Sequence, residues 1–97
     1  MTEKILTLHP AGKTGTNIDK AKYEAIRDAI IAIVTEHEVI SFTNLMEEVG
    51  RRLASSTSPF EGSIAWYTTT VKLDLEARRL IERIPSRSPQ QLRFCKL

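Results

Sequence analysis

The residues able to carry covalent or metal chemistry are few in this 97-residue chain: Cys95, His9 and His37. Cys95 stands near the carboxyl end, with no base that the sequence places beside it. His9 brings no carboxylate or cysteine at the spacing of a metal site, and His37 lies between two acids at the predicted end of a helix, where it is expected to be solvated. We therefore expect no enzyme activity, no metal ion and no cofactor.

Gly12-Lys13-Thr14 is the second half of the phosphate-loop pattern G-x-x-x-x-G-K-S/T, in which backbone N–H groups surround a phosphate. Thr7 stands where that pattern requires its first glycine, and the segment follows Pro10 rather than a buried strand. We expect a flexible turn here, and no bound nucleotide or other small-molecule ligand.

Charge is unevenly distributed, although the net charge is only +2. From Val71 onward there are seven basic and three acidic residues, a balance of +4. The first seventy residues carry seven basic and nine acidic residues, a balance of −2. The basic third favours a negatively charged partner at that end, and the alternative is a solvated surface on which charges cluster by chance.

The spacing of apolar residues predicts helices over 20–36 and 42–53 and a third of about four turns from Ser63. Short polar side chains suit the first two helix starts: Asn17 or Asp19, and Ser41 or Thr43. β-prone runs predict strands at 39–41, 80–84 and 90–97, the last two joined as a hairpin by the turn at 85–89. The predicted fold class is mainly α with a small β-hairpin (α+β).

Residues 1–18 combine the apolar run Ile5-Leu6-Thr7-Leu8 with two glycines and a proline, which predicts an irregular arm. The arm either packs on the body through those apolar side chains or reaches toward a second subunit. The domain division is therefore an arm at 1–18 and one domain at 19–97, since the chain is long enough for a single core.

The third helix carries two apolar lines. The main buried stripe is predicted to contain Ile64, Tyr67 or Thr68, Val71, Leu75 and, beyond the helix, Leu80. The second line consists of Trp66, Thr70, Leu73 and Ala77. A helix with apolar residues on two sides packs against more than one neighbour. The polar side is predicted to contain Thr69, Lys72, Glu76 and Arg79.

The chain has no apolar run of about 18 residues, so no membrane-spanning helix is expected. Its start also lacks the apolar stretch of a secretory signal. A lone cysteine excludes an internal disulfide framework and favours the reducing cytoplasm.

The order of elements, with VKLDLEARRLIER leading into a hairpin, resembles the winged helix-turn-helix superfamily of bacterial transcription regulators. The matching positions are Leu75, Arg78, Leu80, Ile81 and Arg83. Arg79 stands where those proteins often have glycine, so either it adopts a left-handed turn or the helix ends differently. The longer string GSIAWYTTTVKLDLEA resembles a small bacterial family of such domains, a likeness that implies a fold rather than an activity.

The resemblance implies a three-helix core with a two- or three-stranded wing, the third helix in a DNA major groove and the wing along the backbone. On this hypothesis the protein regulates transcription, has no effector domain of its own and binds double-stranded DNA, either as a monomer or as a homodimer. The helix lacks the Arg, Asn or Gln that make the strongest contacts to bases. The candidate DNA contacts are Thr68, Thr69, Lys72, Arg51, Arg52, Arg83, Arg87 and Arg93.

The alternative hypothesis is a winged helix that binds proteins or dimerises without binding DNA. Its candidate contacts are Phe60, Trp66 and Leu73, aided by the arm. Phe60 has a second interpretation as the apolar anchor of its loop, and Trp66 as a packing residue between helices. A continuous positive surface on the third helix and wing would favour DNA, whereas an exposed apolar surface around Trp66 would favour a protein partner.

Overall fold

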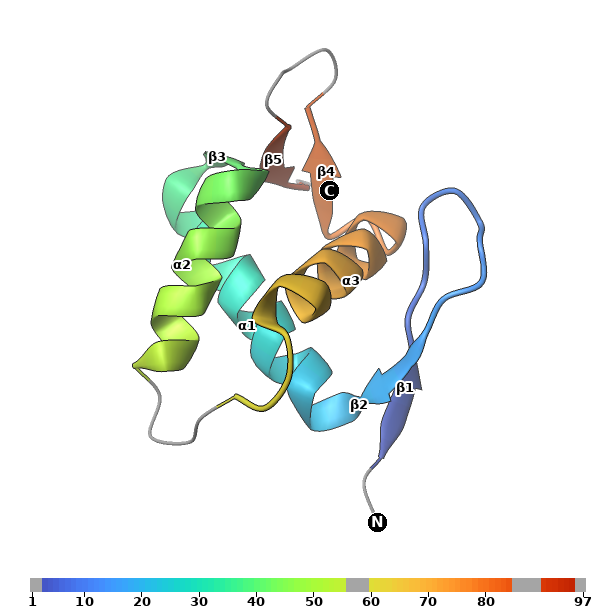
Figure 1. The fold of residues 1–97 in the computed structure, drawn as a ribbon. Helices are drawn as coiled ribbons and strands as arrows, with labels where there is room; N and C mark the ends of the chain where they lie inside the picture. The colour runs from blue at the N-terminus through green and yellow to red at the C-terminus, as the bar shows by residue number, and fades with distance from the viewer. Residues whose placement is uncertain (1–2, 56–59, 85–89, 96–97) are drawn as a thin grey trace.

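The computed structural model describes residues 3–55, 60–84 and 90–95, which form three helices and two small antiparallel sheets (Figure 1). The predicted α+β class is confirmed at this level. The elements in chain order are β1 (Lys4–Leu6), β2 (Asn17–Asp19), α1 (Lys20–His37), β3 (Val39–Ser41), α2 (Phe42–Ala54), α3 (Ile64–Ala77), β4 (Ile81–Arg83) and β5 (Gln91–Phe94).

The backbone N–H groups in the first turn of a helix have no partner within the helix itself. In each of the three helices, a short polar side chain at the start accepts a hydrogen bond from one of them. Asp19, one of two candidates, caps α1 by accepting from the N–H of Ala21 at 2.8 Å. Ser41, also one of two candidates, caps α2. Ser63 caps α3 by accepting from the N–H of Trp66 at 3.1 Å.

The core lies where the three helices meet the sheet of β3, β5 and β4. Its most deeply buried apolar side chains, those 0–1% exposed, come from every one of these layers: Ile26, Ile30, Ile33, Val34, Leu45, Val49, Val71, Leu75, Ile81 and Leu92. Burial of this apolar surface is the main source of stability in a domain of this size. The predicted main stripe of α3 is confirmed at Val71 and Leu75.

The strand order β3-β5-β4 places β5 in the middle, with antiparallel pairing on both sides. Leu92 pairs with Ile40 on one side and with Arg83 on the other, and its side chain is fully buried. The strands predicted at 39–41 and at both arms of the hairpin are therefore present, although β4 and β5 are shorter than expected. The predicted turn at 85–89 lies outside the described residues.

The chain leaves α3 through a left-handed residue, Arg79, with φ 63°. The N–H of Leu80 donates to the carbonyl of Leu75 at 2.9 Å. This hydrogen bond commonly ends a helix at a left-handed residue, which is usually glycine. Of the two expected outcomes at Arg79, the left-handed turn is the one observed. The same turn carries Leu80 out of the buried stripe, and at 37% exposure its predicted burial is wrong.

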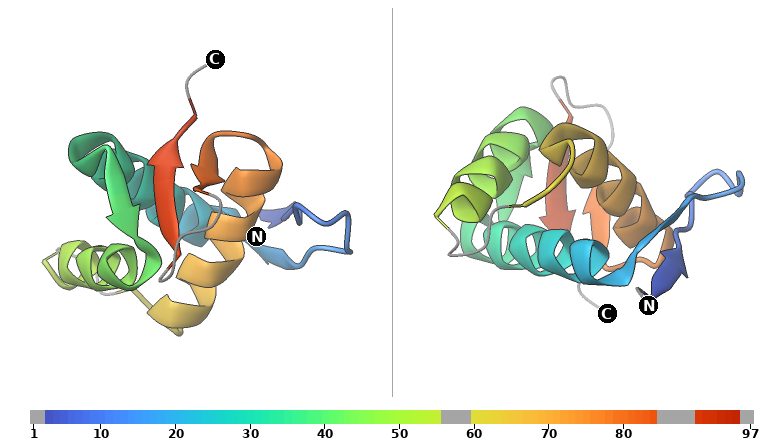
Figure 2. Two further views of the ribbon diagram at one scale, coloured as in Figure 1. Left: turned by 90° about the horizontal axis from the view of Figure 1, so that it is seen from above. Right: turned by 60° about the horizontal axis from the view of Figure 1, so that its bottom comes forward.

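Residues 1–18 were expected to form an irregular arm, but β1 and β2 pair as an antiparallel hairpin, with Ile5 opposite Ile18. Ile5 packs against the core, whereas Leu6 and Leu8 are 53% and 44% exposed. At Gly15 a Cβ atom would lie 1.6 Å from the carbonyl oxygen of Thr7, so only glycine permits the two arms of the hairpin to approach this closely. Figure 2 shows the loop of the hairpin extending beyond the helices.

Candidate functional site

The only three charged residues within α3 are almost completely buried. The side chains of Lys72, Asp74 and Glu76 are 5%, 0% and 8% exposed. Their side chains point to two different sides of α3, and each of them contacts a residue of a neighbouring element. The prediction that Lys72 and Glu76 face outward is therefore wrong.

Lys72 lies on the side of α3 that faces α2 and β4. Its Nζ is 3.3 Å from Oε2 of Glu76 and 5.0 Å from the ring centroid of Phe42. Arg83 approaches the other oxygen of the same carboxylate, with Nε at 4.0 Å from Oε1. Burial lowers the pKa of Lys72, and the attraction of Glu76 offsets part of that effect. The amine is buried in the protein and cannot contact a phosphate in this conformation.

Asp74 lies on the other side of α3 and joins three elements. Its Oδ1 accepts from the backbone N–H of Leu8 at 2.8 Å, and its Oδ2 accepts from Nε of Arg78 at 2.9 Å. The phenol of Tyr23 on α1 donates to the same Oδ2. Burial, together with this hydrogen bond, raises the pKa of Tyr23 to about 12. This carboxylate holds the amino-terminal hairpin against α1 and α3.

This cluster was not predicted from the sequence, because the spacing of α3 alone does not show which elements pack against Asp74. One signal was present in the sequence. Tyr23 stands three and seven residues before the buried Ile26 and Ile30, which puts its ring on the inner face of α1. A buried phenol requires a hydrogen-bond partner, and a carboxylate on a neighbouring helix is the kind of acceptor to look for.

Thr68 is also buried, at 0% exposure, so the structure corrects its prediction as a DNA contact, as it does for Lys72. Residues at 100° intervals share a face only when they are three or four apart, and Thr68 belongs to the face of Val71 and Leu75. Thr69 is exposed, and its hydroxyl donates to the carbonyl of Ala65 at 2.9 Å. Of the three residues of α3 proposed to read DNA, only Thr69 reaches the surface.

Thr68 gives a direct test of this placement, because its Oγ1 has no hydrogen-bond partner among the described residues. A buried hydroxyl without a partner costs about 1–3 kcal/mol, and valine has nearly the same shape without that cost. Thr68→Val is expected to raise the free energy of unfolding by about 1 kcal/mol, measured by urea denaturation. A loss of stability would show that the hydroxyl has a partner. The exposed Thr69→Val is the matched control and is expected to change stability by less than about 0.5 kcal/mol.

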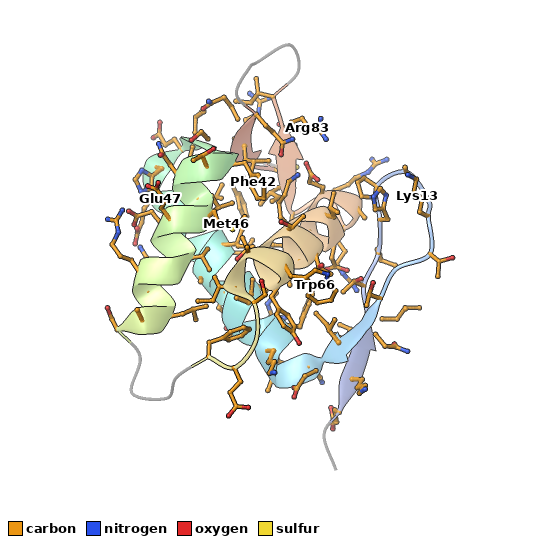
Figure 3. The ribbon with its side chains drawn as sticks, viewed as in Figure 1. Lys13, Phe42, Met46, Glu47, Trp66 and Arg83 are labelled. Carbon is orange, nitrogen blue, oxygen red and sulfur yellow. The ribbon has the colours of Figure 1, made fainter. Side chains whose placement is uncertain are left out.

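The four described arginines proposed as backbone contacts are exposed, but each has a carboxylate partner. The nitrogen–oxygen distances are 2.8 Å for Arg51–Glu48, 2.5 Å for Arg52–Glu36, 4.0 Å for Arg83–Glu76 and 2.5 Å for Arg93–Glu82. They do not gather on one surface either. Arg51 and Arg52 are in the last turn of α2, at the opposite end of the molecule from β4, which carries Arg83 (Figure 1; Figure 3). Arg87 lies outside the described residues.

The outward side of α3 is formed by the second apolar line of the sequence, which we call the α3 seam: Trp66, Thr70, Leu73 and Ala77. Trp66 is 45% exposed, and the other three are half-buried. Ala65 and Thr69, next to the seam, are exposed. Because the charged residues of α3 turn inward, this side of the helix presents only apolar groups and hydroxyls. Figure 3 shows Trp66 on α3, with Phe42 and Met46 of α2 to its left.

The first turn of α3 rests on an aromatic cluster. The ring of Tyr67 meets Trp66 edge to face, with centroids 4.9 Å apart, and meets Phe60 in the same way at 5.2 Å. Lys22 on α1 lies 5.5 Å and 5.8 Å from the centroids of Tyr67 and Phe60. Phe60 is half-buried and packs against the core, which favours its interpretation as the anchor of the loop. Trp66 is thus supported on one side and exposed on the other.

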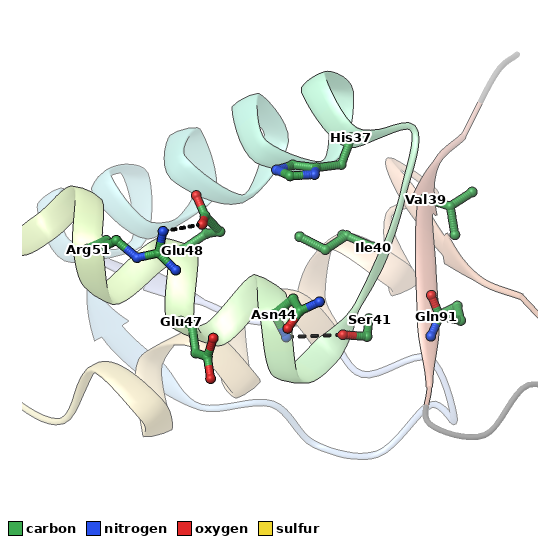
Figure 4. Close-up of a pocket in the computed structure, with 9 residues that line it drawn as sticks. All are labelled: His37, Val39, Ile40, Ser41, Asn44, Glu47, Glu48, Arg51 and Gln91. Carbon is green, nitrogen blue, oxygen red and sulfur yellow. Dashed lines mark hydrogen bonds and ion pairs between the residues drawn. The ribbon is translucent and has the colours of Figure 1, made fainter.

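A hollow of about 450 Å³ lies between the end of α1, β3 and the start of α2 (Figure 4). Its one histidine, His37, is exposed, and Ser41 Oγ is engaged as the cap of α2, accepting from the N–H of Asn44 at 3.1 Å. The ion pair of Glu48 with Arg51 occupies another wall. These side chains do not form an activated nucleophile or a general acid–base pair. The lining residues are His37, Val39, Ile40, Ser41, Asn44, Glu47, Glu48, Arg51 and Gln91.

Within the described ranges 3–55, 60–84 and 90–95, no three or more His, Cys, Asp or Glu residues gather where they could hold a metal ion. The helices in the same ranges are also too short or too polar to cross a membrane. The pKa of the Cys95 thiol is raised by burial and by Glu82, which works against a reactive thiolate.

Residues 4–92 match the family of unknown function DUF6958, and the chain therefore belongs to that family. No curated protein sequence matches the chain.

Proposed function

We propose that this protein is a cytoplasmic winged-helix domain whose third helix binds another protein rather than DNA. The winged-helix part is supported by the element order from α1 to β5 and by a sheet in which β5 lies between β3 and β4. The pairing of β4 with β5 after α3 is also consistent with the wing that the sequence resemblance implies.

The observation that carries the protein-binding part is the chemistry of the outward side of α3. In a helix that reads DNA, exposed cationic and amide side chains face the groove and the phosphates. Here Lys72 points inward, and Trp66 stands at the surface with 45% of its area exposed. Tryptophan is enriched at the centres of protein interfaces, where its large ring is removed from water.

The described arginines that were predicted to contact phosphates give DNA binding little support. Affinity for a duplex comes mainly from the release of counterions when Lys or Arg neutralises phosphates. Arg51, Arg52 and Arg93 are already neutralised by carboxylates at 2.5–2.8 Å, so each would have to exchange that partner for a phosphate. Such an exchange keeps the number of ion pairs nearly constant, so it contributes less to the free energy of DNA binding than a free arginine would.

A photoreactive amino acid tests the proposal in a nuclease-treated extract of the source cells. Placed at Thr69, beside the α3 seam, it is expected to form a protein adduct that disappears when Leu73→Glu is added. The matched control position is Glu47, which is exposed on α2 well away from Trp66 (Figure 3). Failure to form an adduct at position 69 above the level at position 47 would contradict the proposal. Adducts with nucleic acid alone, in an untreated extract, would favour the DNA hypothesis instead.

A further inference from the structure

The spacing of the α3 seam is that of a helix-packing surface. Trp66, Thr70, Leu73 and Ala77 follow one another at intervals of four, three and four residues. This is the repeat by which one helix packs along another, with successive side chains on a single narrow stripe. The main stripe of α3 already packs on α1 and the core, so the seam is a second packing surface of the same helix.

We propose that the partner of this seam is the seam of a second copy of the chain, with the two α3 helices antiparallel about a twofold axis. This inference rests on the proposed function and names its partner. A twofold interface buries the same patch of both copies, so any unpartnered charge in that patch would be buried twice. The α3 seam contains no charged residue, and the buried placement of Lys72, Asp74 and Glu76 keeps their charges out of the contact.

The sizes of the seam residues select the antiparallel arrangement. In an antiparallel helix pair, the first residue of the seam faces the last residue of the partner's seam, and the two middle residues face each other. Trp66 would then face Ala77 of the other copy, and Thr70 would face Leu73. Each large side chain meets a smaller one, as close packing requires. A parallel pair would instead place Trp66 on Trp66 and Ala77 on Ala77, with a clash at one end and a gap at the other.

The length of α3 limits the area that the two helices can bury. α3 has 14 residues and is about 21 Å long, at 1.5 Å per residue. Two such helices bury less than the roughly 800 Å² per partner of a standard interface, so we expect a reversible dimer rather than an obligate one. Leu8 extends the apolar surface on one side, since it is 44% exposed and its backbone is bound to Asp74.

Sedimentation equilibrium of the purified full chain, over about 1 to 500 µM, measures this association. The wild type is expected to dimerise reversibly. Leu73→Glu and Thr70→Lys should each weaken the dimer at least tenfold, because each buries two charges that have no partner. Val39→Glu is the matched control: Val39 is 46% exposed but lies on β3, outside the seam, and its replacement should leave the dimer unchanged.

An equimolar mixture of the Leu73→Glu and Thr70→Lys chains tests the orientation. In an antiparallel pair the introduced carboxylate faces the introduced amine, so the mixture should recover to within about threefold of wild-type affinity. A parallel pair would not bring these positions together. Two weakened variants without recovery in the mixture would therefore overturn the antiparallel arrangement. Circular dichroism of each variant checks that loss of the dimer is not loss of folding.

The dimer and the proposed function can fail separately. A wild-type chain that stays monomeric up to about 500 µM would overturn the self-association inference. If position 69 then still forms its specific protein adduct, binding to a different protein stands. If both the dimer and the adduct are missing, the protein-binding function is overturned as well. A dimer that Val39→Glu abolishes would assign the interface to another surface.

Discussion

Asp74→Ala is expected to lower the free energy of unfolding by about 3–5 kcal/mol, because it removes the acceptor of three buried or half-buried donors at once. The N–H of Leu8, the phenol of Tyr23 and the guanidinium of Arg78 all donate to this carboxylate. The replacement also leaves the positive charge of Arg78 without its partner. Denaturation by urea measures the total loss.

Hydrogen exchange separates the local effect of Asp74→Ala from the global one. At low temperature, where the variant is still folded, the amides of the amino-terminal hairpin should exchange much faster than that of Ile26 in the core. Asp74→Asn is the matched control, since its amide oxygen still accepts from Leu8 although it carries no charge. A variant whose hairpin keeps wild-type protection would contradict the assignment of Asp74 as the residue that holds it.

The phenol of Tyr23 adds a pH dependence to the same cluster. Its pKa is raised to about 12 from an ordinary value of 10, so the folded state holds the proton more tightly than the unfolded chain. The resulting stability is complete below pH 10 and is lost as the pH rises through 12, by about 2–3 kcal/mol for a shift of this size. Tyr23→Phe cannot show this loss. The difference in stability between wild type and Tyr23→Phe should therefore shrink over that window.

Lys72→Ala is the second large prediction, with an expected loss of about 3–5 kcal/mol. It removes the closest described cation from Glu76, whose side chain is 8% exposed, and leaves that carboxylate with Arg83 at 4.0 Å. The hypothesis that Lys72 contacts DNA predicts the opposite pattern, a stable variant with weakened DNA binding. The urea midpoint of the purified variant distinguishes the two.

A double replacement shows whether the loss comes from the unpaired charge. Lys72→Met together with Glu76→Leu removes both charges and keeps the packing against Phe42, so stability should return to within about 1–2 kcal/mol of wild type. Burial already lowers the pKa of Lys72, which means that its charge is held in the interior at a cost. A double variant as unstable as Lys72→Ala would show that the pair contributes more than mutual neutralisation.

The apolar pattern was sufficient to predict the three helices, the pairing of β4 with β5 and the burial of Val71 and Leu75. It was not sufficient for Lys72 and Asp74. Both lie at the boundary between the inner and outer sides of α3, about a quarter to a third of a turn from the exposed stripe. At such positions burial depends on which elements flank the helix. Here Phe42 covers one side and the hairpin covers the other, and neither neighbour can be read from the period of α3 itself.

At the candidate site, too, the sequence predicted one part of the arrangement and not the other. The line of Trp66, Thr70, Leu73 and Ala77 was evident from spacing alone, and its prediction as a second packing surface required no structure. What spacing could not decide was whether another part of the chain covers it. The structure leaves Trp66 45% exposed, because the hairpin packs beside α3, at Asp74, rather than over its outward side.

Fluorescence anisotropy of a labelled mixed-sequence duplex, titrated with the full chain, tests most directly whether the outward side of α3 serves proteins rather than DNA. At about 50 mM salt, where phosphate contacts are strong, we predict no saturable binding below tens of micromolar protein. Saturable binding that weakens as salt is added, with a log–log slope of about −0.9 per phosphate neutralised, would contradict the account.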